Sequence, residues 1–344
     1  MKKVFVLCIV CLICSSCANN DFKSKFEEVG CSSEDIDVIL DKVNPDDYDK
    51  VLNMKCSSDL MNILSAKDYK SDNFSKYISY YDKNKDSNMS DIITIVNSGY
   101  DLTDYKASPL LASLVLERYF ISDNVSRYLD YGNKNNLSSK KIVSLVNANV
   151  DYGFYNKNFE TDVTKDNLVL VNKFYHLPIN YTPSDLVTLT SDYNKGINSK
   201  MRKEAAEAFM EMVSGAKLDN IILKNASAYR SYDYQVTLYN NYVKRDGKKN
   251  ADIYSARPGY SEHQTGLCAD INIIDSSFDN TKEAKWLSNN AYKYGFILRF
   301  PKDKEDITGY KYESWHYRYV GKEAAKIIYD NDLTLEEYYA YYVN

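Results

Sequence analysis

Two of the three histidines in this 344-residue chain lie in short segments that also carry carboxylates. His263 stands in "SEHQTGLCAD", seven residues before Asp270, and His316 stands in "ESWHYRYVG", three residues after Glu313. Two histidines and an aspartate with an open fourth position make a catalytic zinc site, and a nearby glutamate can take a proton from water. The set therefore predicts zinc-dependent hydrolysis. The alternative to a metal site is a cluster of polar residues that are hydrogen-bonded to one another and bind no metal.

A turn and two strands must bring these residues together. Gly266 lets the backbone turn sharply before the strand expected at 268–274, so that His263 and Asp270 converge. Residues three apart in a strand face opposite sides. If Glu313 shares the site, it must therefore lie on the turn that enters the strand of the last histidine.

The same segments resemble the signature segments of the zinc D-alanyl-D-alanine carboxypeptidases of the VanY type, a family that includes L,D-carboxypeptidases of cell-wall maintenance. The patterns Ser-x-His-x-x-Gly-x-Ala-x-Asp and Glu-x-Trp-His are matched by Ser261, His263, Gly266, Asp270, Glu313, Trp315 and His316. "YRSYDYQ" at 229–235 is similar as well. Cys268 departs from the family, which usually has alanine there. The resemblance covers about 168–320 and implies the α+β fold shared by zinc D,D-peptidases and the Hedgehog signalling domain.

The resemblance also implies a role for each matched residue. It assigns His263, Asp270 and His316 as ligands of Zn²⁺, Glu313 as the catalytic base, and Arg230, Gln235 and Ser261 as substrate-binding residues. A guanidinium is a planar fork of donors that matches a carboxylate, so Arg230 suits recognition of a free C-terminus.

The activity expected from this family is removal of the C-terminal D-alanine from peptidoglycan stem peptides. Three alternatives stay open: an L,D-carboxypeptidase that acts on tetrapeptide stems, an endopeptidase that cuts cross-links, and a non-catalytic wall-binding or scaffolding lipoprotein. The presence of Glu313 argues against the non-catalytic alternative, because an active site that has lost its activity commonly loses its catalytic base. The net charge of -5, with scattered charges and no basic stripe, makes nucleic acid an unexpected partner.

Most of the first half of the chain shows helical periodicity and weak internal repetition. Two segments, "DNFSKYISYY" and "IITIVNSGYD", return as "DNVSRYLDYG" at 123–132 and "IVSLVNANVD" at 142–151. Apolar residues at helical spacing within such repeats predict stacked pairs of short helices. We therefore expect a helical repeat region at 18–160, serving as a spacer or docking a protein or wall partner, and a catalytic domain at 161–344.

The N-terminus reads as an export signal over residues 1–17. Lys2 and Lys3 precede an apolar stretch, Val4 to Cys14, that is too short to span a membrane. "CSSC" resembles a lipoprotein cleavage site, which implies a lipid anchor at Cys17. The expected location is therefore the outer face of the cell membrane. Cleavage after Ala18 and secretion is the alternative.

Three cysteines belong to the mature fold. Cys31 and Cys56 are a candidate disulfide pair in an exported protein. Cys268 is expected to be inert packing within its strand. His176 matches no ligand position and is expected to serve packing or to lie on the surface.

Overall fold

The computed structural model describes residues 21–343, and the predicted signal with its Cys17 anchor lies outside them. The chain divides into two compact units between Val143 and Ser144. The boundary expected after residue 160 thus falls inside the second unit, where Ser144 Oγ donates to Glu337 at 2.7 Å. Among the described residues, no helix has the length and apolar character needed to cross a membrane.

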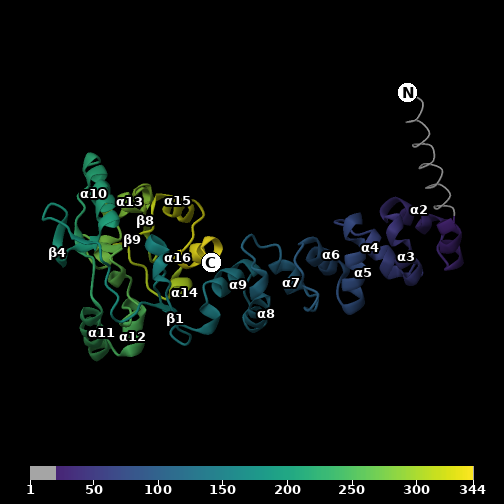
Figure 1. The fold of residues 1–344 in the computed structure, drawn as a ribbon, viewed down its shortest axis with the longest axis horizontal. Coiled ribbons are helices and arrows are strands. Elements are labelled where there is room, and N and C mark those ends of the chain that lie inside the picture. Colours follow the sequence, from purple (N-terminus) through teal and green to yellow (C-terminus); the bar gives the residue numbers. More distant parts are fainter. Residues whose placement is uncertain (1–20, 344) are drawn as a thin grey trace, which may run out of the picture. The chain divides into compact units, whose positions relative to one another are not determined.

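The first unit consists of short helices and turns, without a strand in residues 21–143. This confirms the helical region predicted before the catalytic domain (Figure 1). Residues 21–28 are helical, and the helices that follow are α2 (Ser33–Lys42), α3 (Tyr48–Met54), α4 (Ser58–Leu64), α5 (Phe74–Lys83), α6 (Met89–Asn97), α7 (Pro109–Leu114) and α8 (Val125–Lys134), and α9 (Ser139–Asn147) spans the division.

Helices α5 and α8 come from the two sequence copies and begin in the same way. Each follows a single 3-10 turn. Before α5, the backbone N–H of Lys70 donates to the hydroxyl of Tyr77 at 3.2 Å. Before α8, the N–H of Ile121 donates to the hydroxyl of Tyr128, also at 3.2 Å. Both tyrosines are fully buried. The sequence repeat is therefore also a structural repeat.

A disulfide joins Cys31 to Cys56, the pair that the sequence offered, with their Cα atoms 5.3 Å apart. It links the turn before α2 to the turn after α3. The surrounding core includes Phe26, Ile36 and Ile39. Because the loop it closes is short, the disulfide constrains this part of the unit locally.

The second unit mixes helices with a five-stranded sheet, which confirms the predicted α+β class. Its strands are β1 (Phe159–Glu160), β2 (Tyr175–His176), β3 (Leu186–Thr188), β4 (Asn194–Asn198), β5 (Lys200–Arg202), β6 (Asn225–Ser227), β7 (Cys268–Ile271), β8 (Phe296–Leu298) and β9 (His316–Tyr319). Its helices are α10 (Lys203–Leu218), α11 (Tyr232–Asp246), α12 (Lys248–Tyr254), α13 (Lys282–Asn290), α14 (Glu305–Thr308), α15 (Lys322–Asp330) and α16 (Leu335–Tyr342).

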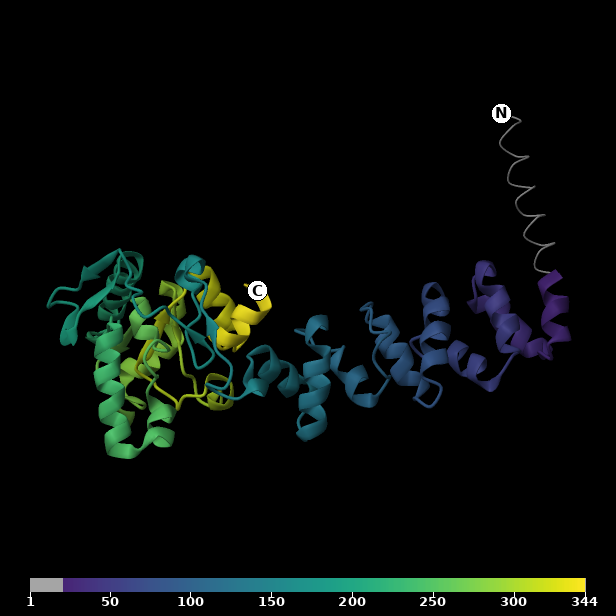
Figure 2. The ribbon, with the colours of Figure 1, turned by 60° about the horizontal axis from the view of Figure 1, so that its bottom comes forward.

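The main sheet has the order β4-β6-β7-β9-β8, and its two faces differ in character. Ala269 on β7 is paired with Tyr317 on β9, and both belong to the apolar core that α10 covers. The alternating residues of the same strands, Asp270 and His316, therefore face the opposite side. There α11 and α12 pack side by side (Figures 1 and 2). Residues of both helices line a pocket.

Strand β7 ends earlier than the sequence predicted, at Ile271 instead of residue 274. Asn272 takes a left-handed backbone conformation with φ 58°, which breaks the strand. Its side-chain oxygen accepts from the N–H of Lys224 at 2.8 Å. The asparagine thus ends the strand one residue after Asp270, a predicted metal ligand.

Candidate metal centre and active site

Each predicted metal-site residue is placed by a specific backbone feature. Asp270 and His316 are direct partners in the β7–β9 ladder. His263 lies on a 3-10 turn that ends at Gly266, whose φ of +69° favours glycine. Glu313 lies on the turn before β9, as the strand geometry required, and its carbonyl accepts from the N–H of His316 at 3.2 Å.

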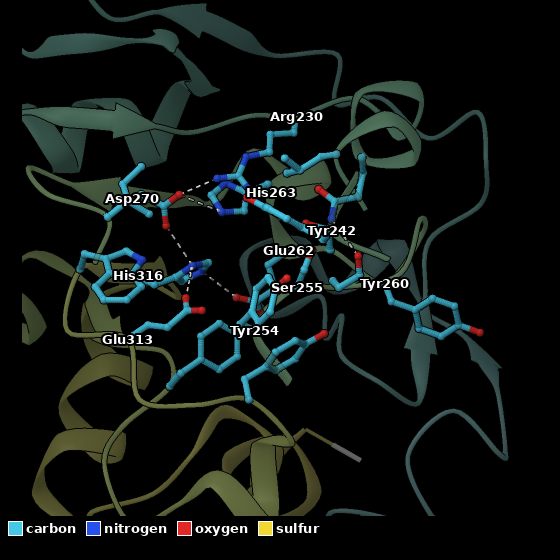
Figure 3. A pocket seen from close by; sticks show the side chains of 18 of the residues that line it. Arg230, Tyr242, Tyr254, Ser255, Tyr260, Glu262, His263, Asp270, Glu313 and His316 are labelled. Atoms are coloured by element: carbon cyan, nitrogen blue, oxygen red, sulfur yellow. Dashed lines mark hydrogen bonds and ion pairs between the residues drawn. The ribbon is translucent and has the colours of Figure 1, made fainter. Parts of the chain in front are cut away.

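The side chains of these four residues converge on one point (Figure 3). His263 Nε2 lies 3.4 Å from Asp270 Oδ2. His316 Nδ1 lies 3.2 Å from Asp270 Oδ1 and 3.4 Å from Glu313 Oε2. The Nδ1 atom of His263 lies 2.7 Å from the carbonyl of Ala228, which orients the ring and leaves Nε2 directed at the aspartate.

The donor set fits a zinc ion. Two imidazole nitrogens and a carboxylate are among the ligands that zinc takes in catalytic sites. All three residues are at least 96% buried, so the donors are held in place by packing. A ligating histidine usually gives its other ring N–H to an oxygen, and the Ala228 carbonyl is such an acceptor for His263.

Electrostatics favour an ionised carboxylate at the centre. Burial opposes ionisation of Asp270, but His263 and Arg230 outweigh it and hold its pKa well below the ordinary value. Burial likewise disfavours a charged His316, yet neighbours that include Cys268 and Asp270 raise its pKa well above the ordinary value. The ionised Asp270 carboxylate therefore favours positive charge at this centre, as a cation site requires.

Cys268 is fully buried, as expected of a packing residue, but its neighbours give it a second property. Its sulfur and one nitrogen from each of His263 and His316 lie within 4.8 Å of one another. Burial raises the pKa of the thiol, and the two histidines more than compensate, lowering it to about 7. This contact with both rings depends on the pairing of β7 with β9, so local sequence alone does not predict it.

Arg230 reaches the site but is not free in this structure. One guanidinium nitrogen donates to Asp270 Oδ2 at 2.6 Å, and Nε donates to Ser227 Oγ at 3.0 Å. Its side chain keeps 16% of its surface exposed, at the pocket that also contains Glu313. The arginine is thus next to the predicted metal ligands and within the space where a substrate would lie.

The other two predicted substrate-binding residues also line the pocket, which has a volume of about 390 Å³. Gln235 donates through its amide to the carbonyl of Ala256 at 2.8 Å. Its amide oxygen is buried and has no hydrogen-bond partner among residues 21–343. Ser261 is 4% exposed and precedes the turn that carries the first histidine.

His176 lies outside the residues that line this pocket. Its Nδ1 lies 3.3 Å from the carbonyl of Leu177, and its ring lies 5.4 Å from that of Tyr260. It is half-buried, in agreement with the packing or surface role predicted for it.

Sequence reasoning missed a group of charged residues buried directly behind the histidines. Glu262, Arg299, Arg318 and Glu336 are each at most 4% exposed. Arg318 shares a strand face with His316, so the period of two could have pointed to it. The others come from segments far apart in the chain, and no local pattern connects them.

Comparison with known proteins assigns the second unit to a family. A sequence model of that family, described as VanY: D-alanyl-D-alanine carboxypeptidase, matches residues 198–322. The putative carboxypeptidase YodJ of Bacillus subtilis (strain 168) is 51% identical over 181 residues, which cover 50% of this chain and 66% of YodJ. The bifunctional D-Ala-D-Ala dipeptidase and D-Ala-D-Ala carboxypeptidase VanXYC of Enterococcus gallinarum is 34% identical over 183 residues. These cover 51% of this chain and 94% of VanXYC.

Two solved structures are similar over the same part. The LdcB LD-carboxypeptidase is 49% identical and covers 52% of this chain and 87% of its own, with a TM-score of 0.49. A mutant of the vancomycin resistance D,D-pentapeptidase VanY, in complex with Zn(II), is 34% identical. The match covers 50% of this chain and 98% of that chain, with a TM-score of 0.44.

Fold class, metal-type site and sequence matches agree, and the chain belongs to the VanY family of D-alanyl-D-alanine carboxypeptidases. The match spans 66%, 60% and 65% of the lengths of three curated relatives. It also covers only about half of this chain. Membership therefore concerns the second unit.

Proposed function

We propose that the second unit is a zinc-dependent D,D-carboxypeptidase that removes the C-terminal D-alanine from peptidoglycan stem peptides. The observation that carries this proposal is the convergence of His263 Nε2, His316 Nδ1 and the Asp270 carboxylate beside a fourth residue, Glu313, that lines the pocket. Family membership supports the reaction class.

The geometry of the site supports a separate role for each of these residues. His263, Asp270 and His316 would hold zinc, which when bound supplies Lewis-acid activation of water and of the scissile carbonyl. Glu313 takes the proton of the attacking water at its carboxylate and passes it to the leaving amine. Its side chain is 12% exposed, so it is shielded yet reachable from the pocket.

Arg230 supports a carboxypeptidase over an endopeptidase. A free C-terminus carries a carboxylate, whereas an internal peptide bond presents no such anion. The guanidinium can give two parallel charge-assisted hydrogen bonds to that carboxylate. Gln235, whose amide oxygen has no hydrogen-bond partner among residues 21–343, offers an acceptor for a substrate N–H in the same pocket.

The decisive experiment compares muropeptides of different length. Zinc-loaded protein should convert pentapeptide stems to tetrapeptides, as measured by mass spectrometry, and the Glu313→Gln variant should not. Conversion of tetrapeptides with pentapeptides left intact would replace the D,D activity with the L,D alternative. Cleavage of cross-linked dimers alone would establish the endopeptidase.

We further propose that the protein works outside the cytoplasm, held at the membrane by a lipid on Cys17. The export-type sequence of residues 1–17 supports this location. The disulfide between Cys31 and Cys56 also supports it, because disulfides persist in oxidising compartments.

A further inference from the structure

Two buried polar atoms face each other behind the candidate metal centre. Glu262 Oε2 and His316 Nε2 both lack a hydrogen-bond partner among the described residues, and they lie 3.7 Å apart. The side chains of both residues are at least 95% buried. Leaving such atoms unpaired is costly, so native proteins usually satisfy them. The separation is somewhat longer than a hydrogen bond.

The other oxygen of Glu262 is fully engaged. Oε1 accepts from Arg299 Nε and from Arg318 Nη1, both at 2.8 Å. Burial alone would raise the pKa of Glu262, but the two arginines outweigh it and hold that pKa well below the ordinary value. Because one oxygen takes both arginines, the second is left to face His316.

The two arginines are themselves anchored. Arg299 makes a two-pronged ion pair with Glu336 on α16, with distances of 2.6 and 2.9 Å. Arg318 donates to the backbone carbonyls of Asn167 and Val169 at 3.1 and 2.7 Å. Two glutamates and two arginines balance in charge, which a buried cluster requires. The Glu262 carboxylate is therefore fixed in position behind the histidine.

We propose that Glu262 is a positioning residue for the metal centre. In the zinc-bound protein its Oε2 would move within hydrogen-bond distance and accept the Nε2–H of His316, which fixes the tautomer that presents Nδ1 to the metal. The Arg299–Glu336 pair transmits this restraint from α16. The inference rests on the proposed zinc site and adds a residue that acts through the ligand His316. Its rival is that Glu262 only neutralises the two arginines.

Zinc affinity separates the two roles. In Glu262→Gln, an amide that keeps its oxygen on the arginines must turn its NH₂ toward His316 Nε2, so that two donors face each other. Removing an outer carboxylate of this kind weakens metal binding by about 10- to 100-fold. We expect that increase in the zinc dissociation constant, measured by competition with a chromogenic chelator. Unchanged affinity in a folded Glu262→Gln protein would overturn the proposal.

Glu337→Gln is the matched control. Glu337 is also buried on α16, but its carboxylate accepts from Ser144 and Thr334. We expect the Glu337→Gln substitution to lower the midpoint of thermal unfolding and to leave the zinc affinity unchanged. An equal loss of affinity in both variants would mean that general destabilisation, and not the contact with His316, weakens the site.

A spectroscopic test reports on the protonation of His316 directly. Histidine labelled with ¹⁵N gives a simple spectrum, since the chain has three histidines. In zinc-loaded protein, long-range ¹H–¹⁵N correlations should show His316 protonated at Nε2, and that proton should resonate further downfield than in Glu262→Gln, because it is hydrogen-bonded to a carboxylate. Protonation at Nδ1 would overturn the proposal. If the unmutated protein bound no zinc, the metal site itself would fail, and this inference with it.

Discussion

Glu313 and His263 belong to the same site, but their replacement should have different effects on zinc content and turnover. Glu313 lies 3.4 Å from His316 Nδ1 on the pocket side, whereas His263 supplies one of the three predicted ligand atoms. We expect Glu313→Gln to bind near-stoichiometric zinc and lose nearly all turnover, and His263→Ala to lose both. Metal analysis and peptide hydrolysis of the same preparations measure this. Wild-type turnover in Glu313→Gln would show that another group is the base.

Arg230 has two possible ion-pair partners. It pairs with Asp270 in this structure, and in the proposed complex it would pair with the substrate carboxylate. If it binds that carboxylate, Arg230→Ala should lose about 2–5 kcal/mol of transition-state stabilisation. The unmutated enzyme should cleave a stem peptide acid and not its C-terminal amide, and the variant should discriminate little between them. A zinc titration of the variant reports separately on the contact with Asp270. Equal rates of the unmutated enzyme on acid and amide would contradict the carboxylate role.

Among the elements, the paired strands β7 and β9 were the most predictable from sequence. Their alternation placed Asp270 and His316 on one face, and the spacing of Glu313 required a turn, which the structure has. The charged cluster behind them was not predictable. Arg299 and Glu336 meet only through tertiary packing, and nothing in either local sequence specifies the partner. Short strands such as β4 have little periodicity of their own, because tertiary pairing sets their register.

Lys173 connects two elements of the pocket wall and gives this unit a pH-dependent stability. It donates to the carbonyls of Asp252 on α12 and Gly309 after α14. Burial lowers its pKa from 10.5 to about 8. Between these values the unfolded chain keeps a proton that the folded protein has lost, so the free energy of unfolding should rise with pH there, by at most about 3 kcal/mol. Below that window both states are protonated and the slope vanishes.

Urea unfolding of Lys173→Met across the same pH window tests this. The variant should lose the rise, because it has no proton to release. Lys249→Met is the control, since Lys249 is an exposed lysine on α12. It should keep the slope of the unmutated protein. Parallel slopes for Lys173→Met and the unmutated protein would assign the pH dependence to other groups.

For the whole molecule, the proposed lipid anchor makes the location testable in cells. If Cys17 carries the lipid, labelling with a radioactive fatty acid should vanish in Cys17→Ala, and the protein should leave the detergent phase or remain an unprocessed precursor. The Cys31–Cys56 disulfide provides an independent reading of the compartment. Labelling that persisted in Cys17→Ala would place the acyl group elsewhere.

The ion pair between Arg299 and Glu336 also bears on the order in which the chain is made. Ribosomes synthesise from the N-terminus, so α16 emerges after every other part of the charged cluster. Until then, burying both arginines would set two positive charges against the single carboxylate of Glu262, which is strongly unfavourable. A nascent chain that ends before residue 335 therefore keeps this region open. We therefore expect the predicted zinc ligands to reach their final arrangement only after α16 has been synthesised, and the proposed metal loading to follow that step.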